Sequence, residues 1–97
     1  MRESVIQFIS LGRLPDEEVA EVAQLQEFEV ALKNIERPVS NQEAVALLSS
    51  FPTGEHSCFG LAWSLLHLIE TAPGWPPQEA RQQESTPWIK TMLERAV

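Results

Sequence analysis

The side chains best able to do chemistry lie in one apolar stretch of the chain, Leu61–Glu70, with the sequence LAWSLLHLIE. Ser64, His67 and Glu70 follow one another at intervals of three residues, which places them on one side of a helix. Glu70 could orient the His67 imidazole, and His67 could take a proton from Ser64. Such a row on a single helix lacks an oxyanion hole. A small hydrolase is therefore the least favoured hypothesis, and we assign no catalytic residue.

Other chemical sites have even less support. The potential metal ligands include His56, Cys58 and His67, but they do not follow the spacing of a zinc or calcium motif. Cys58 and His67 would also lie on opposite sides of one helix. The four glycines form no phosphate-binding pattern. We therefore predict a protein without a metal, without a cofactor and without enzymatic activity.

The same stretch predicts a surface for binding another protein. A helix over this region has a broad apolar face and an opposite polar strip. The predicted apolar face holds Cys58, Phe59, Leu61, Ala62, Leu65, Leu66, Leu68 and Ile69. The strip holds Trp63, His67 and Glu70, which we predict to contact a partner because indoles are favoured interface anchors. The alternative is that a neighbouring helix and the loop bearing Trp75 cover this strip.

Charge narrows the class of partner. The chain carries a formal net charge of −7, and residues 1–57 hold ten acidic against four basic side chains. Nucleic acid and anionic membranes are poor partners for such a surface, because phosphates require clustered Lys and Arg. We predict a basic protein partner that contacts Asp16, Glu17, Glu18 and Glu21. The alternative is a solvated helix face whose acids complement the positive end of the helix dipole.

These candidates require a helical framework. No stretch alternates with the period of a strand, and proline and glycine fall where helical apolar periods stop, so we predict an all-α fold. A length of 97 residues supports one domain, 1–97, with a single core. Five helices are predicted, at about 2–11, 15–37, 40–51, 57–72 and 86–96, with 73–85 as a loop that includes one turn at 78–82.

The sequence is compatible with two ways of packing these helices. They can form a small compact bundle, or helices two and three can pair as HEAT-like antiparallel hairpins. The apolar stripe of the long second helix changes direction near residues 23–26. This change indicates either a kink or packing on two different neighbours.

Capping residues mark several helix ends. Gly12 is placed to end the first helix, and Pro15 with Asp16 is placed to begin the second. Ser40 and Glu43 have the spacing of a capping box at the start of the third helix. In the third and fifth helices the predicted buried side chains are Ala44, Leu47, Leu48, Phe51, Trp88, Ile89, Met92, Leu93 and Ala96.

The predicted compartment is the cytoplasm. The N-terminal apolar residues are few and are interrupted by Gln7, so they do not form the core of a signal peptide. No apolar run reaches the roughly 18–20 residues that a bilayer span needs. The single cysteine, Cys58, cannot form an internal disulfide, which fits a reducing compartment.

Two segments, Cys58–Trp63 (CFGLAW) and Leu66–Trp75 (LHLIETAPGW), resemble part of small bacterial helical proteins of uncharacterised function. The resemblance covers most of the chain and supplies neither an activity nor catalytic residues. In size and charge the chain is similar to the immunity partners of secreted bacterial toxins. The leading hypothesis is thus a non-enzymatic protein-binding module, and most concretely an immunity-type inhibitor of a basic toxin or nuclease. The alternative is a self-associating scaffold or regulatory module, including a homodimer.

Overall fold

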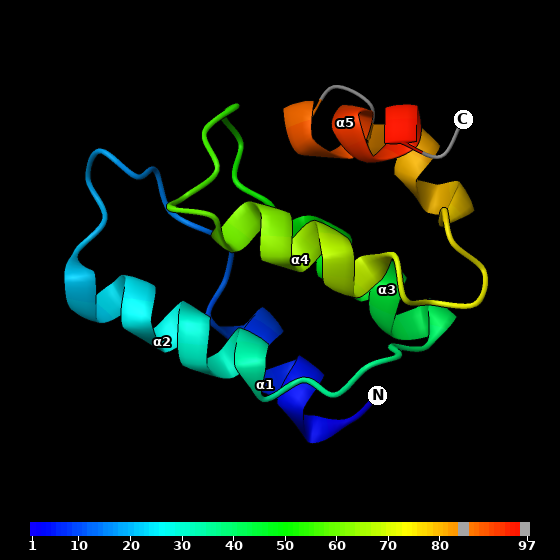
Figure 1. Cartoon of the computed structure of the whole chain (residues 1–97), viewed down its shortest axis with the longest axis horizontal. Coiled ribbons are helices and arrows are strands. Elements are labelled where there is room, and N and C mark those ends of the chain that lie inside the picture. The colour runs from blue at the N-terminus through cyan, green and yellow to red at the C-terminus, as the bar shows by residue number, and fades with distance from the viewer. Residues whose placement is uncertain (84–85, 96–97) are drawn as a thin grey trace.

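The computed structural model of the chain describes residues 1–83 and 86–95. Within these residues the fold is entirely helical, with five α-helices, two short 3-10 segments and no strand (Figure 1). The elements are α1 Glu3–Ser10, α2 Val22–Lys33, α3 Asn41–Leu47, η1 Leu48–Ser50, α4 Leu61–Ile69, η2 Gln78–Gln83 and α5 Pro87–Arg95. The predicted all-α bundle of five helices is confirmed. None of the described helices combines the length and the apolar character needed to cross a bilayer.

α4 lies at the centre of the bundle. It packs against α2 and α3, while α1 packs against the same two helices and α5 packs against η2. In Figure 1, α2 runs along one side of α4 and α5 lies on the other. The main neighbours of α2 are therefore α1 and α4, which corresponds to the small bundle rather than to paired HEAT-like hairpins. The buried residues of α4 are Leu61, Ala62, Leu65, Leu66, Leu68 and Ile69. Because burying one leucine or isoleucine contributes about 1.5–3 kcal/mol, α4 supplies much of the hydrophobic stabilisation.

The predicted capping box fixes the start of α3. The Ser40 hydroxyl accepts a hydrogen bond from the Glu43 backbone N–H at 3.1 Å, and the Glu43 carboxylate accepts one from the Ser40 backbone N–H at 2.9 Å. The side chains predicted for the buried face of this helix are all buried, namely Ala44, Leu47, Leu48 and Phe51. Local capping and the apolar period thus agree for this element.

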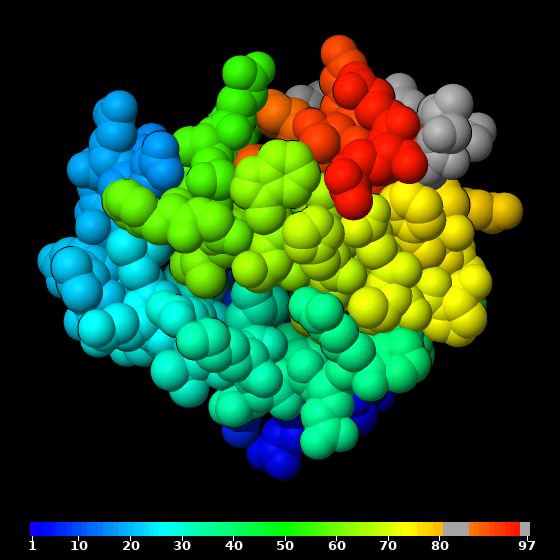
Figure 2. Space-filling model, in the orientation of Figure 1, coloured from blue at the N-terminus to red at the C-terminus, as the bar shows by residue number. Residues whose placement is uncertain are grey.

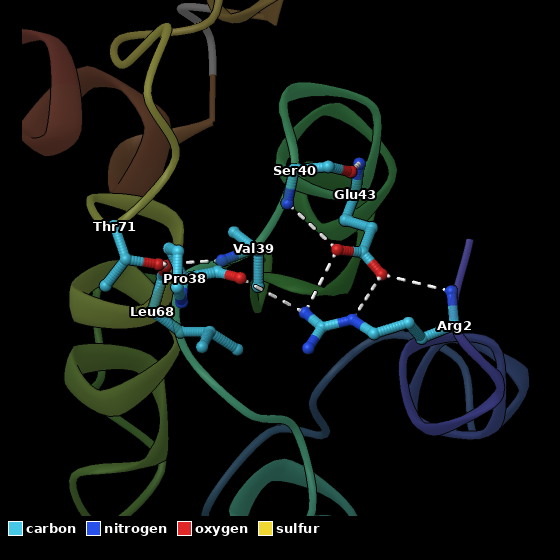
Figure 3. A network of polar contacts seen from close by, with 7 residues as sticks. All are labelled: Arg2, Pro38, Val39, Ser40, Glu43, Leu68 and Thr71. Atoms are coloured by element: carbon cyan, nitrogen blue, oxygen red, sulfur yellow. Dashed lines mark hydrogen bonds and ion pairs between the residues drawn. The ribbon is translucent and has the colours of Figure 1, made fainter.

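Glu43 also ties the beginning of the chain to α3, as Figure 3 shows. Its carboxylate accepts hydrogen bonds from the Arg2 backbone N–H (3.1 Å), Nε (3.1 Å) and Nη2 (3.0 Å). Only 3% of Glu43 is exposed, so its charge is compensated by these donors instead of by water. The bonds from Arg2 lower the pKa of Glu43 to about 2. We call Arg2, Ser40 and Glu43 the Arg2–Glu43 corner.

The second helix begins at Val22, later than the predicted start at Pro15. Asp16 forms an isolated turn instead: its carboxylate accepts from the Glu18 N–H at 2.9 Å, and its carbonyl accepts from the Val19 N–H at 3.1 Å. Val19 and Val22 are 77% and 70% exposed, so no apolar contact supports a helix through this segment. The single long helix was a wrong prediction, because the Asp16 side chain competes for the backbone and burial does not oppose it.

α4 begins at Leu61, because the residues before it adopt left-handed backbone conformations. These residues are Cys58, Phe59 and Gly60, with φ values of 51°, 55° and 87°. Glycine adopts such angles freely, whereas a bulky side chain is strained there. The prediction that Phe59 lies on the apolar face was wrong, since the residue is 69% exposed. The other seven residues predicted for that face are buried.

α4 also ends earlier than predicted, at Ile69 rather than Ala72. The Thr71 hydroxyl donates a hydrogen bond to the Leu68 carbonyl at 2.6 Å and accepts one from the Val39 N–H at 3.0 Å (Figure 3). These two bonds hold the connection between α2 and α3 against the end of α4.

The described part of the predicted loop 73–85, residues 73–83, packs onto the rest of the molecule. Its turn is the 3-10 segment η2, where Ala80 is fully buried, and Trp75 packs against the core from a partly buried position. In α5, Trp88, Ile89 and Met92 are buried as predicted, whereas Leu93 is only partly buried and packs against the core. The predicted core position Ala96 and residues 84–85 of the loop lie outside the described residues.

Candidate functional site

The strip of α4 that we predicted to bind a partner is open to solvent over much of its length. Trp63, Ser64 and His67 are exposed, and Glu70 is partly buried. The Trp63 indole, the largest of these side chains, belongs to a residue that is 41% exposed. The strip is therefore not sealed inside the monomer, and the Trp75 segment leaves it accessible.

Four rings connect this strip to the core. Trp88 stacks on Phe51 with ring centroids 6.1 Å apart and planes 3° apart. Trp63 then meets Trp88 edge to face at 4.8 Å and 87°, and His67 lies 6.3 Å from Trp63 at 35°. The Trp88 Nε1–H donates to the His56 carbonyl at 2.8 Å, which fixes the indole in place. We call Phe51, Trp88, Trp63 and His67 the aromatic ladder. Because Trp88 holds Trp63, the exposed indole has little side-chain freedom left to lose on binding.

Glu70 has a different neighbour from the one that the hydrolase hypothesis requires. Its two carboxylate oxygens accept hydrogen bonds from Arg95 Nε at 3.0 Å and Nη2 at 3.1 Å. These bonds join the end of α4 to α5 and raise the pKa of Arg95. Within the described part of the chain, no hydrogen bond joins Ser64, His67 and Glu70 to one another. The geometry therefore does not show the proton-transfer contacts between Ser64, His67 and Glu70 that the hydrolase hypothesis requires.

A cleft opens beside Trp63, between α4, α5 and the connection that precedes α4. Its volume is about 610 Å³, and its lining residues are Glu55, Trp63, Pro87, Trp88, Lys90, Thr91 and Glu94. Figure 2 shows α4, in yellow-green, and α5, in orange to red, side by side on this face of the molecule. Glu55, Lys90 and Glu94 are exposed, so their charges face solvent at the cleft. We call this feature the Trp63 cleft.

The acidic residues predicted to contact a partner lie in the turn before α2. Asp16, Glu18 and Glu21 are exposed, and Glu17 is partly buried. Burial, and then the negative charges of Glu17 and Asp16 in this turn, raise the pKa of the Cys58 thiol just before α4. His67 and Glu70 belong to the other half of α4. The seven predicted site residues therefore fall into two groups: the four acids of this turn, and the strip of Trp63, His67 and Glu70 that runs along α4.

Phe59 is a candidate contact residue that the sequence reasoning missed. Its ring is held in solvent by the left-handed backbone before α4, where the Gly60 N–H donates to the Ser57 hydroxyl at 3.2 Å. It lines one end of a groove between α2 and α4 whose apolar residues include Leu25 and Leu32. The available signal was Gly60, since a glycine before a helix can mark a break in the helical period.

The described residues contain no group of three or more His, Cys, Asp or Glu side chains positioned to hold a metal ion. The single thiol, Cys58, is buried in the core. Its raised pKa keeps it protonated and unreactive near neutral pH.

Comparison with known proteins leaves the function to be argued from the chain's own geometry. No protein-family model, no curated protein and no solved structure matches this chain. The exposed indole, the cleft beside it and the acidic turn are therefore the features on which a function can be proposed.

Proposed function

We propose that this chain is a non-enzymatic, cytoplasmic protein-binding module, and most concretely an immunity-type inhibitor that masks a basic toxin or nuclease. The observation that carries the proposal is the exposed Trp63 indole, which the buried Trp88 holds in one orientation. A large, rigid aromatic side chain at the surface is the type of anchor that dominates protein interfaces.

Charge supports a basic partner. The chain has a net charge of −7, and Asp16, Glu18 and Glu21 project from the turn before α2. A negative field of this kind speeds the encounter with a cationic protein and selects against anionic ones. The acidic turn would steer the partner, and Trp63 with His67 would supply the contact at short range. Glu70 would contribute less, because Arg95 already occupies both of its oxygens.

The proposal is tested by affinity capture from the native cytosol with three versions of the chain as bait. The wild type should retain a basic protein, and the Trp63→Ala variant should retain it about tenfold less well. Val30→Ala is the matched control, because Val30 is an apolar residue of α2 that is 59% exposed and lies outside the proposed surface. The captured protein should lose its toxic or nuclease activity when the wild-type chain is added.

Two results would contradict this function. One is the failure of the wild-type chain to retain any basic protein at low ionic strength. The other is equal retention by the wild type and Trp63→Ala, which would remove the indole from the interface.

A self-associating scaffold is the second candidate, and the exposure of Phe59 favours it. An aromatic side chain that is 69% exposed on strained backbone is a natural contact for a second copy of the chain. Sedimentation at micromolar concentration distinguishes the two candidates. A dimer that dissociates in Phe59→Asn supports self-association, and a strict monomer excludes it.

A further inference from the structure

The Trp63 cleft combines an indole surface with two carboxylates. Trp63 and Trp88 meet at 87°, so their ring planes form two walls at a right angle. Trp88 itself is only 4% exposed, so the accessible ring at the cleft is that of Trp63. A cation placed over an indole within about 6 Å of the ring centre is attracted by its negative face.

The charges around the cleft favour a cationic occupant. Glu55, in the connection before α4, and Glu94, in the last turn of α5, both line the cleft. Among the described residues that line the cleft, Lys90 is the single cationic side chain beside two carboxylates, which leaves an excess of one negative charge there. Among the residues described, neither Glu55 nor Glu94 forms an ion pair, whereas Glu29, Glu43 and Glu70 each do. The two carboxylates are therefore available to a ligand.

We infer that the Trp63 cleft binds an arginine side chain of a basic partner, with the guanidinium stacked on Trp63 and hydrogen-bonded to Glu55 and Glu94. A guanidinium suits this site better than an ammonium, because it is planar, stacks on aromatic rings and presents several N–H donors in one plane. The inference rests on the proposed function and makes it more specific, because it names the partner group that the surface recognises.

The same two helices already bind one guanidinium within the chain. Arg95 of α5 donates two hydrogen bonds to Glu70 of α4 at 3.0 and 3.1 Å. This pair lies at the far end of α4 and keeps Arg95 engaged there. The Trp63 cleft offers the same kind of acceptor together with a ring surface, and it offers them to a group from outside the chain.

The test is an NMR titration of the full ¹⁵N-labelled chain with N-acetyl-arginine amide, observed at the Trp63 indole N–H. We expect a saturable shift with a dissociation constant of about 1–10 mM, the range expected for one stacked and paired side chain. N-acetyl-citrulline amide, which has a similar shape without the charge, should give no saturable shift. N-acetyl-lysine amide should bind several-fold more weakly.

Variants locate the binding site. The double substitution Glu55→Gln with Glu94→Gln should weaken arginine binding at least about fivefold. The matched control is Glu27→Gln with Glu36→Gln, which makes the same charge change at two exposed residues that do not line the cleft, and it should leave binding unchanged. Trp63→Ala, followed at the Trp88 indole N–H, should abolish binding.

Three outcomes would overturn the inference: no saturable shift with arginine, an equal shift with citrulline, or an equal loss of binding in both double variants. Failure here is distinct from failure of the proposed function. If a basic protein is still captured through Trp63 while the arginine probe does not bind, the inhibitor proposal stands and the arginine site falls. If no basic protein is captured, the proposed function itself falls.

Discussion

The Arg2–Glu43 corner and the Trp63 cleft use carboxylates in opposite ways. In the corner, one buried carboxylate accepts four hydrogen bonds from Arg2 and Ser40, and the network is closed. In the cleft, Glu55 and Glu94 face solvent beside an exposed indole. A closed network contributes to stability and has no capacity left for a ligand. The open one contributes little to stability and keeps its acceptors available, which is the arrangement expected of a binding surface.

The largest expected effect is a loss of stability on truncating Trp88, at the buried base of the aromatic ladder, compared with Trp63 at its exposed end. Trp88→Ala should reduce the free energy of unfolding by about 3–5 kcal/mol, because it opens a cavity beside Phe51 and removes the hydrogen bond to the His56 carbonyl. Trp63→Ala should cost less, about 1–2 kcal/mol, since that residue is 41% exposed. Urea denaturation measures both. Equal costs would show that Trp63 is a core residue and would remove the contrast.

The next effect concerns the corner. Glu43→Ala should lower the free energy of unfolding by about 2–3 kcal/mol, because it removes the carboxylate that accepts from the Ser40 N–H in the capping box and from Arg2. The cost stays below that of a fully buried ion pair, because Arg2 is partly exposed and recovers water. Glu55→Ala is the control and should change stability by less than about 0.5 kcal/mol. A comparable loss in Glu55→Ala would mean that the cleft carboxylates are structural.

The dependence of stability on pH tests the role of the buried Glu43 carboxylate in the corner. The pKa of Glu43 is lowered from 4.5 to about 2, so the folded state holds this proton less tightly than the unfolded state. The Glu43 contribution is therefore present above about pH 4.5 and is lost as the pH falls toward 2. Glu43→Gln should be less stable than the wild type at neutral pH, and its stability should fall less steeply over this window. Thermal unfolding at a series of pH values measures the two curves, and parallel curves would contradict the prediction.

The smallest effect lies at the start of α4. Phe59→Asn should raise the free energy of unfolding by up to about 1 kcal/mol, because asparagine tolerates a positive φ and the exposed ring buries little surface. Gly60→Ala should lower it by about 1 kcal/mol, because φ is 87° there. Apart from the adjacent residues of the chain, no atom lies within 4 Å of the added methyl group, so this cost is conformational. Destabilisation by Phe59→Asn would show that the ring packs after all.

Local signals predicted well where they agreed with burial. Ser40 and Glu43 formed the predicted capping box, and the apolar period of Leu61–Ile69 identified the central helix. The predicted second helix failed because its first part, around Asp16, has acids and exposed valines with nothing to pack against. Helix propensity near a proline and three acids was not sufficient without a buried face.

Part of the candidate site could also be predicted. The helical angle of Trp63 and His67 placed them away from the apolar face of α4, but it left open whether the Trp75 loop covers them. The positions of Glu55, Glu94 and Arg95 relative to that strip were not predictable, because they depend on how α5 packs on α4 far along the chain. The outward position of Phe59 depends on three consecutive left-handed residues, and of these only Gly60 was a recognisable signal.

The sequence by itself determined the helical class, the central role of the Leu61–Ile69 segment and the acidic character of the surface, because periodicity, capping and charge are properties of neighbouring residues. Only the tertiary structure decided which carboxylates are closed into networks and which remain open. Glu43 and Glu55 are similar as residues in a sequence, and they differ because Arg2 reaches Glu43 across the fold.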